Sequence, residues 1–167
     1  MQTSGVVNVR IAGVGDAGGC AAVLAALPDF FTPDTHAQVA PALGEHRGWA
    51  AVEDDAVIGF VIAEVRYRES AEITFAAVLP DRRGAGIGTA LVNEALATLA
   101  NDGVKVVEVK TLDASSGYEP YVATRAFWEG AWVPANRLHR PAPRLAARQP
   151  LGDLRRRPRT DALAHLP

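Results

Sequence analysis

Three glycines at alternate positions, Gly84, Gly86 and Gly88, follow two adjacent arginines in the middle of the chain. An apolar segment, residues 72–78, leads into this turn, and a segment with helical spacing of apolar residues, 90–100, leaves it. Glycine lets the backbone come close to a ligand, and the free N–H groups of a helix N-terminus attract an anion. Alternate glycines beside arginines suit a pyrophosphate. The pattern therefore indicates a nucleotide-type cofactor.

The elements that must position this turn follow the order β-α-α-β-β-β-α-β-α. Asp16 is expected to cap the first helix, and Thr32 followed by Pro33 is expected to open the second. Asp54-Asp55 predicts a hairpin turn between two strands. The expected strands are residues 6–11, 48–52, 56–65, 72–78 and 104–111, and the expected helices are residues 16–27, 32–43, 90–100 and 121–129. This alternation predicts an α/β fold.

The bulk properties predict one globular domain without a membrane span. The 167 residues are 49% apolar and 22% charged, as in water-soluble proteins, and no apolar run approaches the roughly 20 residues of a span. The N-terminus shows no signal-peptide pattern, so we expect a cytoplasmic protein. The single cysteine, Cys20, and four scattered histidines give no metal-ligand spacing, so no metal site is expected.

The charge is divided unevenly along the chain. Residues 1–130 hold 9 Lys/Arg and 17 Asp/Glu, a net charge of −8, whereas residues 131–167 hold 8 Arg and 2 Asp, a net charge of +6. The second segment also contains 6 of the 11 prolines and shows no strand pattern. Taken by itself, it is a solvated or disordered Arg/Pro-rich tail.

Two motifs in this order resemble the GNAT-type N-acetyltransferase family. The family signature Arg/Gln-x-x-Gly-x-Gly/Ala is met by residues 83–88, which follow an apolar strand and Val78-x-Pro80. Residues 121–129, ending Phe-Trp-Glu, resemble the family's last helix, which commonly ends Phe/Leu-Tyr-Glu-x-x-Gly-Phe. The resemblance covers residues 6–130. It implies a three-layer α/β fold with a mixed central sheet and helices on both faces.

The resemblance implies acetyl-CoA as the acetyl donor. The backbone edge at Ala76–Val78, splayed from its neighbour by a bulge, is expected to pair with pantetheine, and the Val78 N–H is expected to polarise the acetyl carbonyl. Arg82 adds long-range attraction for the anionic cofactor. The residues expected to bind the pyrophosphate are Arg83, Gly84, Ala85, Gly86, Ile87, Gly88 and Thr89.

The resemblance also suggests a general base and a general acid. Glu72 lies in a strand similar to the one that carries the base in the histone-acetylating branch; its alternative is a solvated strand residue, and Glu53 and Glu64 are weaker candidates. Trp128 stands where the family often has the tyrosine acid, and indole cannot supply that proton. Tyr121, two helical turns earlier, is the candidate acid, with Tyr118 or water as alternatives.

The expected acceptor is a small-molecule or protein amine, and the charge of −8 on residues 1–130 favours a cationic one. Two other functions are left open. One is a degenerate CoA-binding module without activity, and the other is nucleic-acid binding through the arginine-rich segment. The resemblance leaves a homodimer open as well.

The segment after residue 130 lacks the family's Gly-Phe and the two strands expected to complete the sheet. Reading one nucleotide later through the Trp132-Val133 codons restores Gly and permits Phe at the family spacing. We therefore interpret residues 131–167 as an out-of-frame translation, against the alternatives of a disordered extension or a nucleic-acid-binding arm. The open sheet edge and incomplete acceptor pocket would follow from it.

Overall fold

The computed structural model describes residues 6–110, 117–131 and 144–147. The strands are β1 (Asn8–Ala12), β2 (Arg47–Glu53), β3 (Ala56–Tyr67), β4 (Ser70–Val78), β5 (Val106–Val109) and β6 (Arg144–Ala147). The helices are α1 (Ala17–Ala25), α2 (Pro33–His36), α3 (Val39–Glu45), α4 (Ile87–Asn101) and α5 (Tyr121–Ala131). Three-residue 3₁₀ turns precede α1 and α4, at Val14–Asp16 and Pro80–Arg82.

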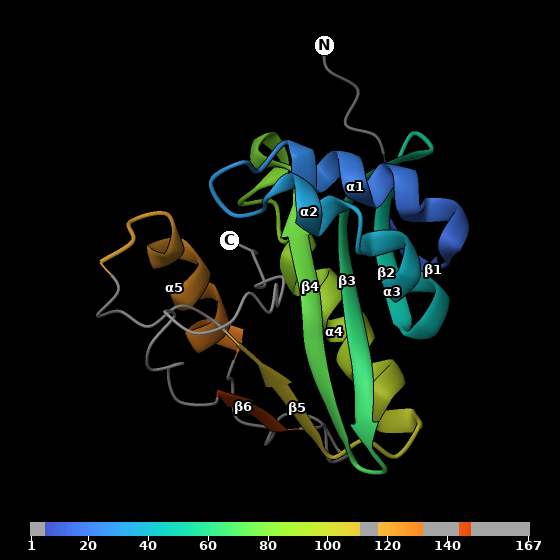
Figure 1. Ribbon diagram of the computed structural model, residues 1–167. Coiled ribbons are helices and arrows are strands. Elements are labelled where there is room, and N and C mark those ends of the chain that lie inside the picture. The colour runs from blue at the N-terminus through green and yellow to red at the C-terminus, as the bar shows by residue number, and fades with distance from the viewer. Residues whose placement is uncertain (1–5, 111–116, 132–143, 148–167) are drawn as a thin grey trace.

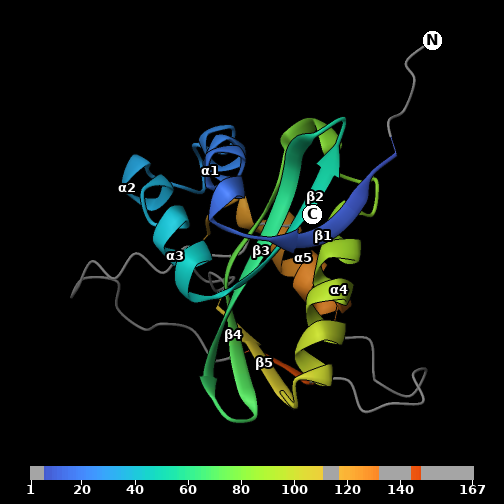
Figure 2. The ribbon, with the colours of Figure 1, turned by 90° about the vertical axis from the view of Figure 1, so that its right-hand side faces the viewer.

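These elements form three layers around one mixed sheet, which confirms the predicted fold class. The strands lie in chain order; β1 to β4 pair antiparallel, and β4, β5 and β6 pair parallel. Helices α1, α2 and α3 cover one face and α4 covers the other (Figures 1 and 2). Helix α5 lies beside β4, near the carboxyl end of β5 (Figure 1).

The sheet buries apolar side chains on both faces. On the α4 face, Leu91, Val92, Ala95 and Leu99 are buried, as their helical spacing predicted. On the opposite face, α1 and α3 pack on the sheet, and the fully buried side chains there include Leu24, Val39, Phe60 and Ile62. Each fully buried leucine or phenylalanine contributes about 1.5–3 kcal/mol, so the two cores fix the sheet and the turns at its ends.

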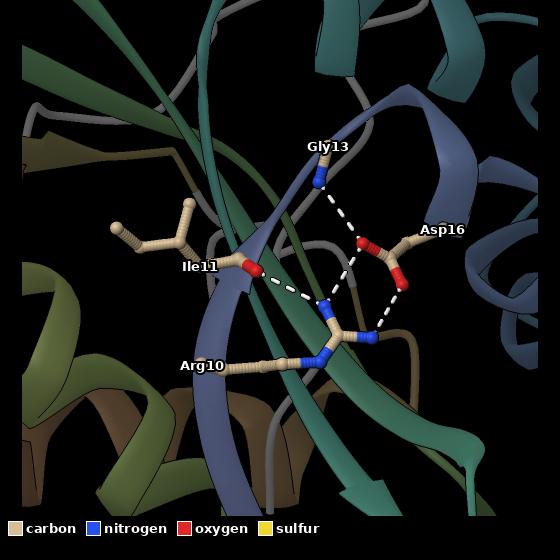
Figure 3. A network of polar contacts seen from close by, with 4 residues as sticks. All are labelled: Arg10, Ile11, Gly13 and Asp16. Atoms are coloured by element: carbon tan, nitrogen blue, oxygen red, sulfur yellow. Dashed lines mark hydrogen bonds and ion pairs between the residues drawn. The ribbon is translucent and has the colours of Figure 1, made fainter.

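A polar network fixes the turn between β1 and α1 (Figure 3). The Asp16 carboxylate accepts hydrogen bonds from the Gly13 N–H at 3.0 Å and from both terminal nitrogens of Arg10 at 2.7 and 3.1 Å. Arg10 Nη1 also donates to the Ile11 carbonyl. The Arg10 hydrogen bonds hold the pKa of Asp16 below its ordinary value. Asp16 is the N-cap residue of α1, as expected, but its side chain bonds backward to Gly13 rather than into the helix.

The expected helix over residues 32–43 is wrong as one continuous element, since the structure divides it into α2 and α3. Pro41 gives the physical reason. In an uninterrupted helix it would lack its N–H and clash with the carbonyl of Ala37, whereas in the first turn of α3 neither penalty arises. Thr32 and Pro33 do open α2 as expected.

The hairpin predicted at Asp54-Asp55 is confirmed, with positive φ angles of 48° and 63° at these residues. Two consecutive positive φ angles are the geometry of a tight hairpin turn that matches strand twist.

The expectation of no strand after residue 130 is wrong for β6, which pairs with β5. An unpaired strand edge offers N–H and C=O groups to any extended backbone, whatever its side chains, so no apolar pattern was needed. The rest of the arginine-rich segment, including the restored-frame position at residues 132–133, lies outside the described residues.

Candidate active site

The glycine turn joins β4 to α4 through two residues in the left-handed region. Gly84 has φ +77° and Gly86, the N-cap of α4, has φ +78°. A Cβ added at either position would meet no atom within 4 Å, so both glycines border open space. Ile87 and Gly88 are buried in the first turn of α4, while Ala85 and Thr89 are exposed. The turn has the backbone shape and the free helix N-terminus that an anion requires.

Arg83 presents an unpaired cation at this turn. Its Nε and Nη2 atoms are buried and have no hydrogen-bond partner within the described part of the chain. Burial holds the pKa of Arg83 below its ordinary value, although an arginine remains charged at neutral pH. A buried guanidinium without an acceptor is costly, so this geometry points to an anionic ligand.

The neighbouring Arg82, which is expected to add long-range attraction for the cofactor, forms an ion pair with Glu53. Its Nε and Nη2 contact Glu53 Oε2 at 2.9 and 2.7 Å. The ion pair anchors the turn to β2 and largely neutralises the Arg82 charge. It also engages Glu53, one of the weaker base candidates.

The edge of β4 next to this turn has no second partner strand among the described residues. Within them, parallel pairing with β5 ends at Ile73, and a bulge places Thr74 as an extra residue opposite β3, so the bulge predicted for this strand is present. Beyond Ile73, β3 is the one strand of the described residues that pairs with β4. The Leu79 N–H bonds to the Ile58 carbonyl on β3. Because successive N–H groups alternate in direction, those of Ala76 and Val78 point away from β3, toward the open edge.

Glu72 is buried, at 3% exposure, on the sheet face that carries α1 to α3. Its carboxylate pairs with Arg66 Nε at 2.9 Å and with Lys110 Nζ at 2.9 Å. Glu64 on β3 pairs with the same Arg66 at 3.1 Å. Glu72 is therefore an ion-paired residue of a charged cluster over β3, β4 and β5, and the alternative of a solvated strand residue is wrong.

Tyr121 begins α5 and is buried, at 3% exposure. Its ring lies 5.4 Å from Phe30 and 5.9 Å from Tyr118, between centroids. Burial raises the pKa of Tyr121 above its ordinary value, so the phenol stays protonated at neutral pH. Trp128 is a core residue at 2% exposure, in agreement with the packing role expected for it.

The other reactive side chains show no site. Cys20 is buried within α1, and burial raises the pKa of its thiol to about 12, which keeps it protonated. Across the described residues, no group of three His, Cys, Asp or Glu side chains could hold a metal ion. None of the described helices is both long and apolar enough to cross a bilayer.

A family model for the GNAT acetyltransferases matches residues 22–117, more than half of the chain. The chain belongs to the GNAT acetyltransferase family. The match contains the open edge of β4, the glycine turn and the whole of α4. No curated protein matches the sequence.

Solved structures of GNAT acetyltransferases share the fold at low sequence identity. A putative GNAT acetyltransferase from Desulfovibrio desulfuricans is 22% identical with a TM-score of 0.62, covering 75% of this chain and 83% of that one. A GNAT family protein from Streptococcus pneumoniae is 19% identical, with a TM-score of 0.59 and coverages of 75% and 85%. An aminoglycoside N-acetyltransferase, solved with CoA, is 15% identical, with a TM-score of 0.61 and coverages of 78% and 90%.

Sequence reasoning missed three residues of this site. Arg66 and Lys110 reach Glu72 from neighbouring strands, and the strand register that brings them there cannot be read locally. Phe30 lies 5.6 Å below the Arg83 guanidinium, although 53 positions separate the two in the chain.

Proposed function

We propose that this GNAT protein is an acetyl-CoA-dependent N-acetyltransferase that transfers the acetyl group directly to an amine. The observation that carries this proposal is the pair of buried Arg83 nitrogens, Nε and Nη2, that no described residue pairs with, at a glycine turn that opens a helix. A pyrophosphate satisfies the free nitrogens of Arg83 and occupies the open space bordered by Gly84 and Gly86. The residues present thus fit the cofactor.

Bound acetyl-CoA supplies an acetyl group activated as a thioester. The N–H groups of Ala76 and Val78 are free to pair with the pantetheine arm, since they point toward the open edge of β4. We assign the Val78 N–H to the acetyl oxygen, where a preorganised donor stabilises the negative charge that develops during transfer.

We assign to Glu72 the role of the general base that takes the proton of the attacking amine. Arg66 and Lys110 hold its carboxylate in place on the acceptor side of the sheet. Glu72 precedes Ala76 by four residues, or roughly 13 Å of strand, so the proton reaches it through water. Tyr121, which stays protonated, is assigned the donation of a proton to the departing thiolate.

The acceptor is a cationic amine in this proposal. Residues 1–130 carry a net charge of −8, which attracts cations from solution. The aminoglycoside acetyltransferases among the solved GNAT structures are proteins named for acceptors of this chemistry.

Calorimetric titration with CoA tests the cofactor half of the proposal. We expect saturable binding to the unaltered chain, and at least a tenfold loss in the Arg83→Gln variant because one charge-assisted contact is removed. Gly86→Ala should weaken binding as well, since its φ of +78° costs an L-residue about 1–2 kcal/mol. Gly18→Ala is the matched control, because Gly18 lies in α1 with open space around it. Unchanged binding in both turn variants would contradict the assignment.

A second candidate is a CoA-binding module without transferase activity. The two ion pairs of Glu72 favour it, because they engage both carboxylate oxygens of the candidate base. Turnover separates the candidates: only the enzyme releases free thiol from acetyl-CoA in proportion to an added amine.

A further inference from the structure

Phe30 connects three segments that are distant in the sequence. It lies between α1 and α2, partly buried against the core of that face. Its ring centroid is 5.6 Å from the Arg83 guanidinium carbon and 5.4 Å from the Tyr121 ring, which is inclined at 50° to it. The next residue back, Asp29, accepts a hydrogen bond of 2.8 Å from Tyr118 Oη through its carbonyl. The position of the Phe30 ring is therefore set from α5 as well as from its own segment.

The Arg83 guanidinium lies over the face of this ring. No described residue accepts a hydrogen bond from Arg83 Nε or Nη2, so no carboxylate or carbonyl orients these atoms. An arginine side chain has many rotamers, and one that is not held loses freedom when it binds a ligand. The face of an aromatic ring attracts a guanidinium and also excludes water from one side of it.

We propose that Phe30 is a positioning residue that holds Arg83 ready for the pyrophosphate of the cofactor. The inference rests on the proposed function, because it takes the anion at the glycine turn to be that of CoA. Phe30 acts through Arg83 and does not itself contact the phosphates. The ring face accepts no hydrogen bond from the edge of the guanidinium, and no described residue pairs with Arg83 Nε or Nη2.

The inference predicts that a change at Phe30 weakens only the binding of the pyrophosphate part of CoA. Phe30→Leu keeps an apolar side chain but removes the aromatic face. We expect its Kd for CoA to rise about three- to tenfold, the range of a cation–π contact. Its Kd for pantetheine, which lacks the pyrophosphate, should stay within about twofold. Phe30→Tyr retains the ring face and should bind CoA like the unaltered chain.

Two controls separate this role from a loss of structure. Phe31→Leu removes the adjacent ring, which is buried in the core at 3% exposure, and should lower the melting temperature without changing the ratio of the two Kd values. In an Arg83→Gln background, Phe30→Leu should add no further loss of CoA affinity, because the residue it positions is absent.

The outcomes distinguish this inference from the function on which it rests. If Phe30→Leu leaves the Kd for CoA unchanged, the positioning role is contradicted. The same holds if Phe30→Leu raises the Kd for CoA and the Kd for pantetheine by the same factor. Either result leaves the proposed function intact. Failure of the unaltered chain to bind CoA contradicts both the proposed function and the role of Phe30.

Discussion

At the scale of residues, the proposed site separates into a cofactor half and an acceptor half with different chemistry. The proposed cofactor half has Arg83, two of whose nitrogens have no partner among the described residues. The acceptor half has a carboxylate, Glu72, whose two partners are already in place. The carboxylate is buried while Arg66 and Lys110 are partly exposed, so the two ion pairs offset the desolvation of Glu72. Glu72 thus stabilises the β4–β5 junction in addition to the catalytic role proposed for it.

Replacing Glu72 tests that catalytic role. We expect Glu72→Gln to lower kcat by about 10²- to 10⁴-fold, the usual contribution of a positioned base, while CoA affinity changes by less than about threefold. Glu108→Gln is the matched control, since Glu108 is the cross-strand partner of Glu72 on β5. Rates are compared only after melting curves show that both variants are folded. Equal kcat values for Glu72→Gln and Glu108→Gln would remove Glu72 from the mechanism.

At the scale of elements, much of what depends on local pattern was predicted from the sequence, although the break between α2 and α3 was not. The strand that leads into the glycine turn, the apolar stripe of α4 and the hairpin at Asp54-Asp55 all follow from spacing or turn chemistry, and the structure has them. The partners that β4 and the turn acquire across the sheet could not be predicted, because they depend on register. The four-residue strand β6 shows the same limit, since its pairing depends on the free edge of β5 rather than on its own side chains.

The turn before α1 gives a prediction on stability and pH. Asp16→Asn should lower the free energy of unfolding at pH 7 by about 0.5–1 kcal/mol, the range of a surface ion pair, because Arg10 is half exposed and solvent screens the pair. The pKa of Asp16 is lowered in the folded state, so its contribution is present above the ordinary aspartate pKa of about 4 and is lost below it.

Urea unfolding of the unaltered chain and of Asp16→Asn from pH 7 to pH 3 measures this effect. The difference between their free energies of unfolding should shrink as the pH falls through the Asp16 pKa. A difference that stays constant over that range would show that the charge of Asp16 contributes nothing to stability.

At the scale of the whole molecule, the chain combines an acidic acetyltransferase fold with a basic C-terminal segment. The net charge is −8 for residues 1–130 and +6 for residues 131–167, so the two parts of the chain differ in sign as well as in composition. A shifted reading frame in GC-rich coding DNA explains the arginine and proline content of that segment. We therefore propose that residues 131–167 are out of frame, and that residues 6–130 are the functional domain.

Restoring the frame at the codons for residues 130–132 tests this proposal. The restored chain should melt at a higher temperature and bind acetyl-CoA more tightly, because the in-frame strands would replace the four-residue β6 beside β5 and bury more apolar surface. Sequencing the gene across these codons is the independent check. An uninterrupted reading frame together with equal melting temperatures would exclude the frameshift.

The central claim is amine acetylation, and amine-dependent thiol release from acetyl-CoA measures it most directly. A panel of polyamines, aminoglycosides and lysine peptides is tested with this chain and with its Glu72→Gln variant. We predict at least one amine for which thiol release and acetylated amine appear in equal amounts, with little release from the variant. Tight CoA binding with no amine-dependent release from a folded protein would contradict the claim and leave a CoA-binding module.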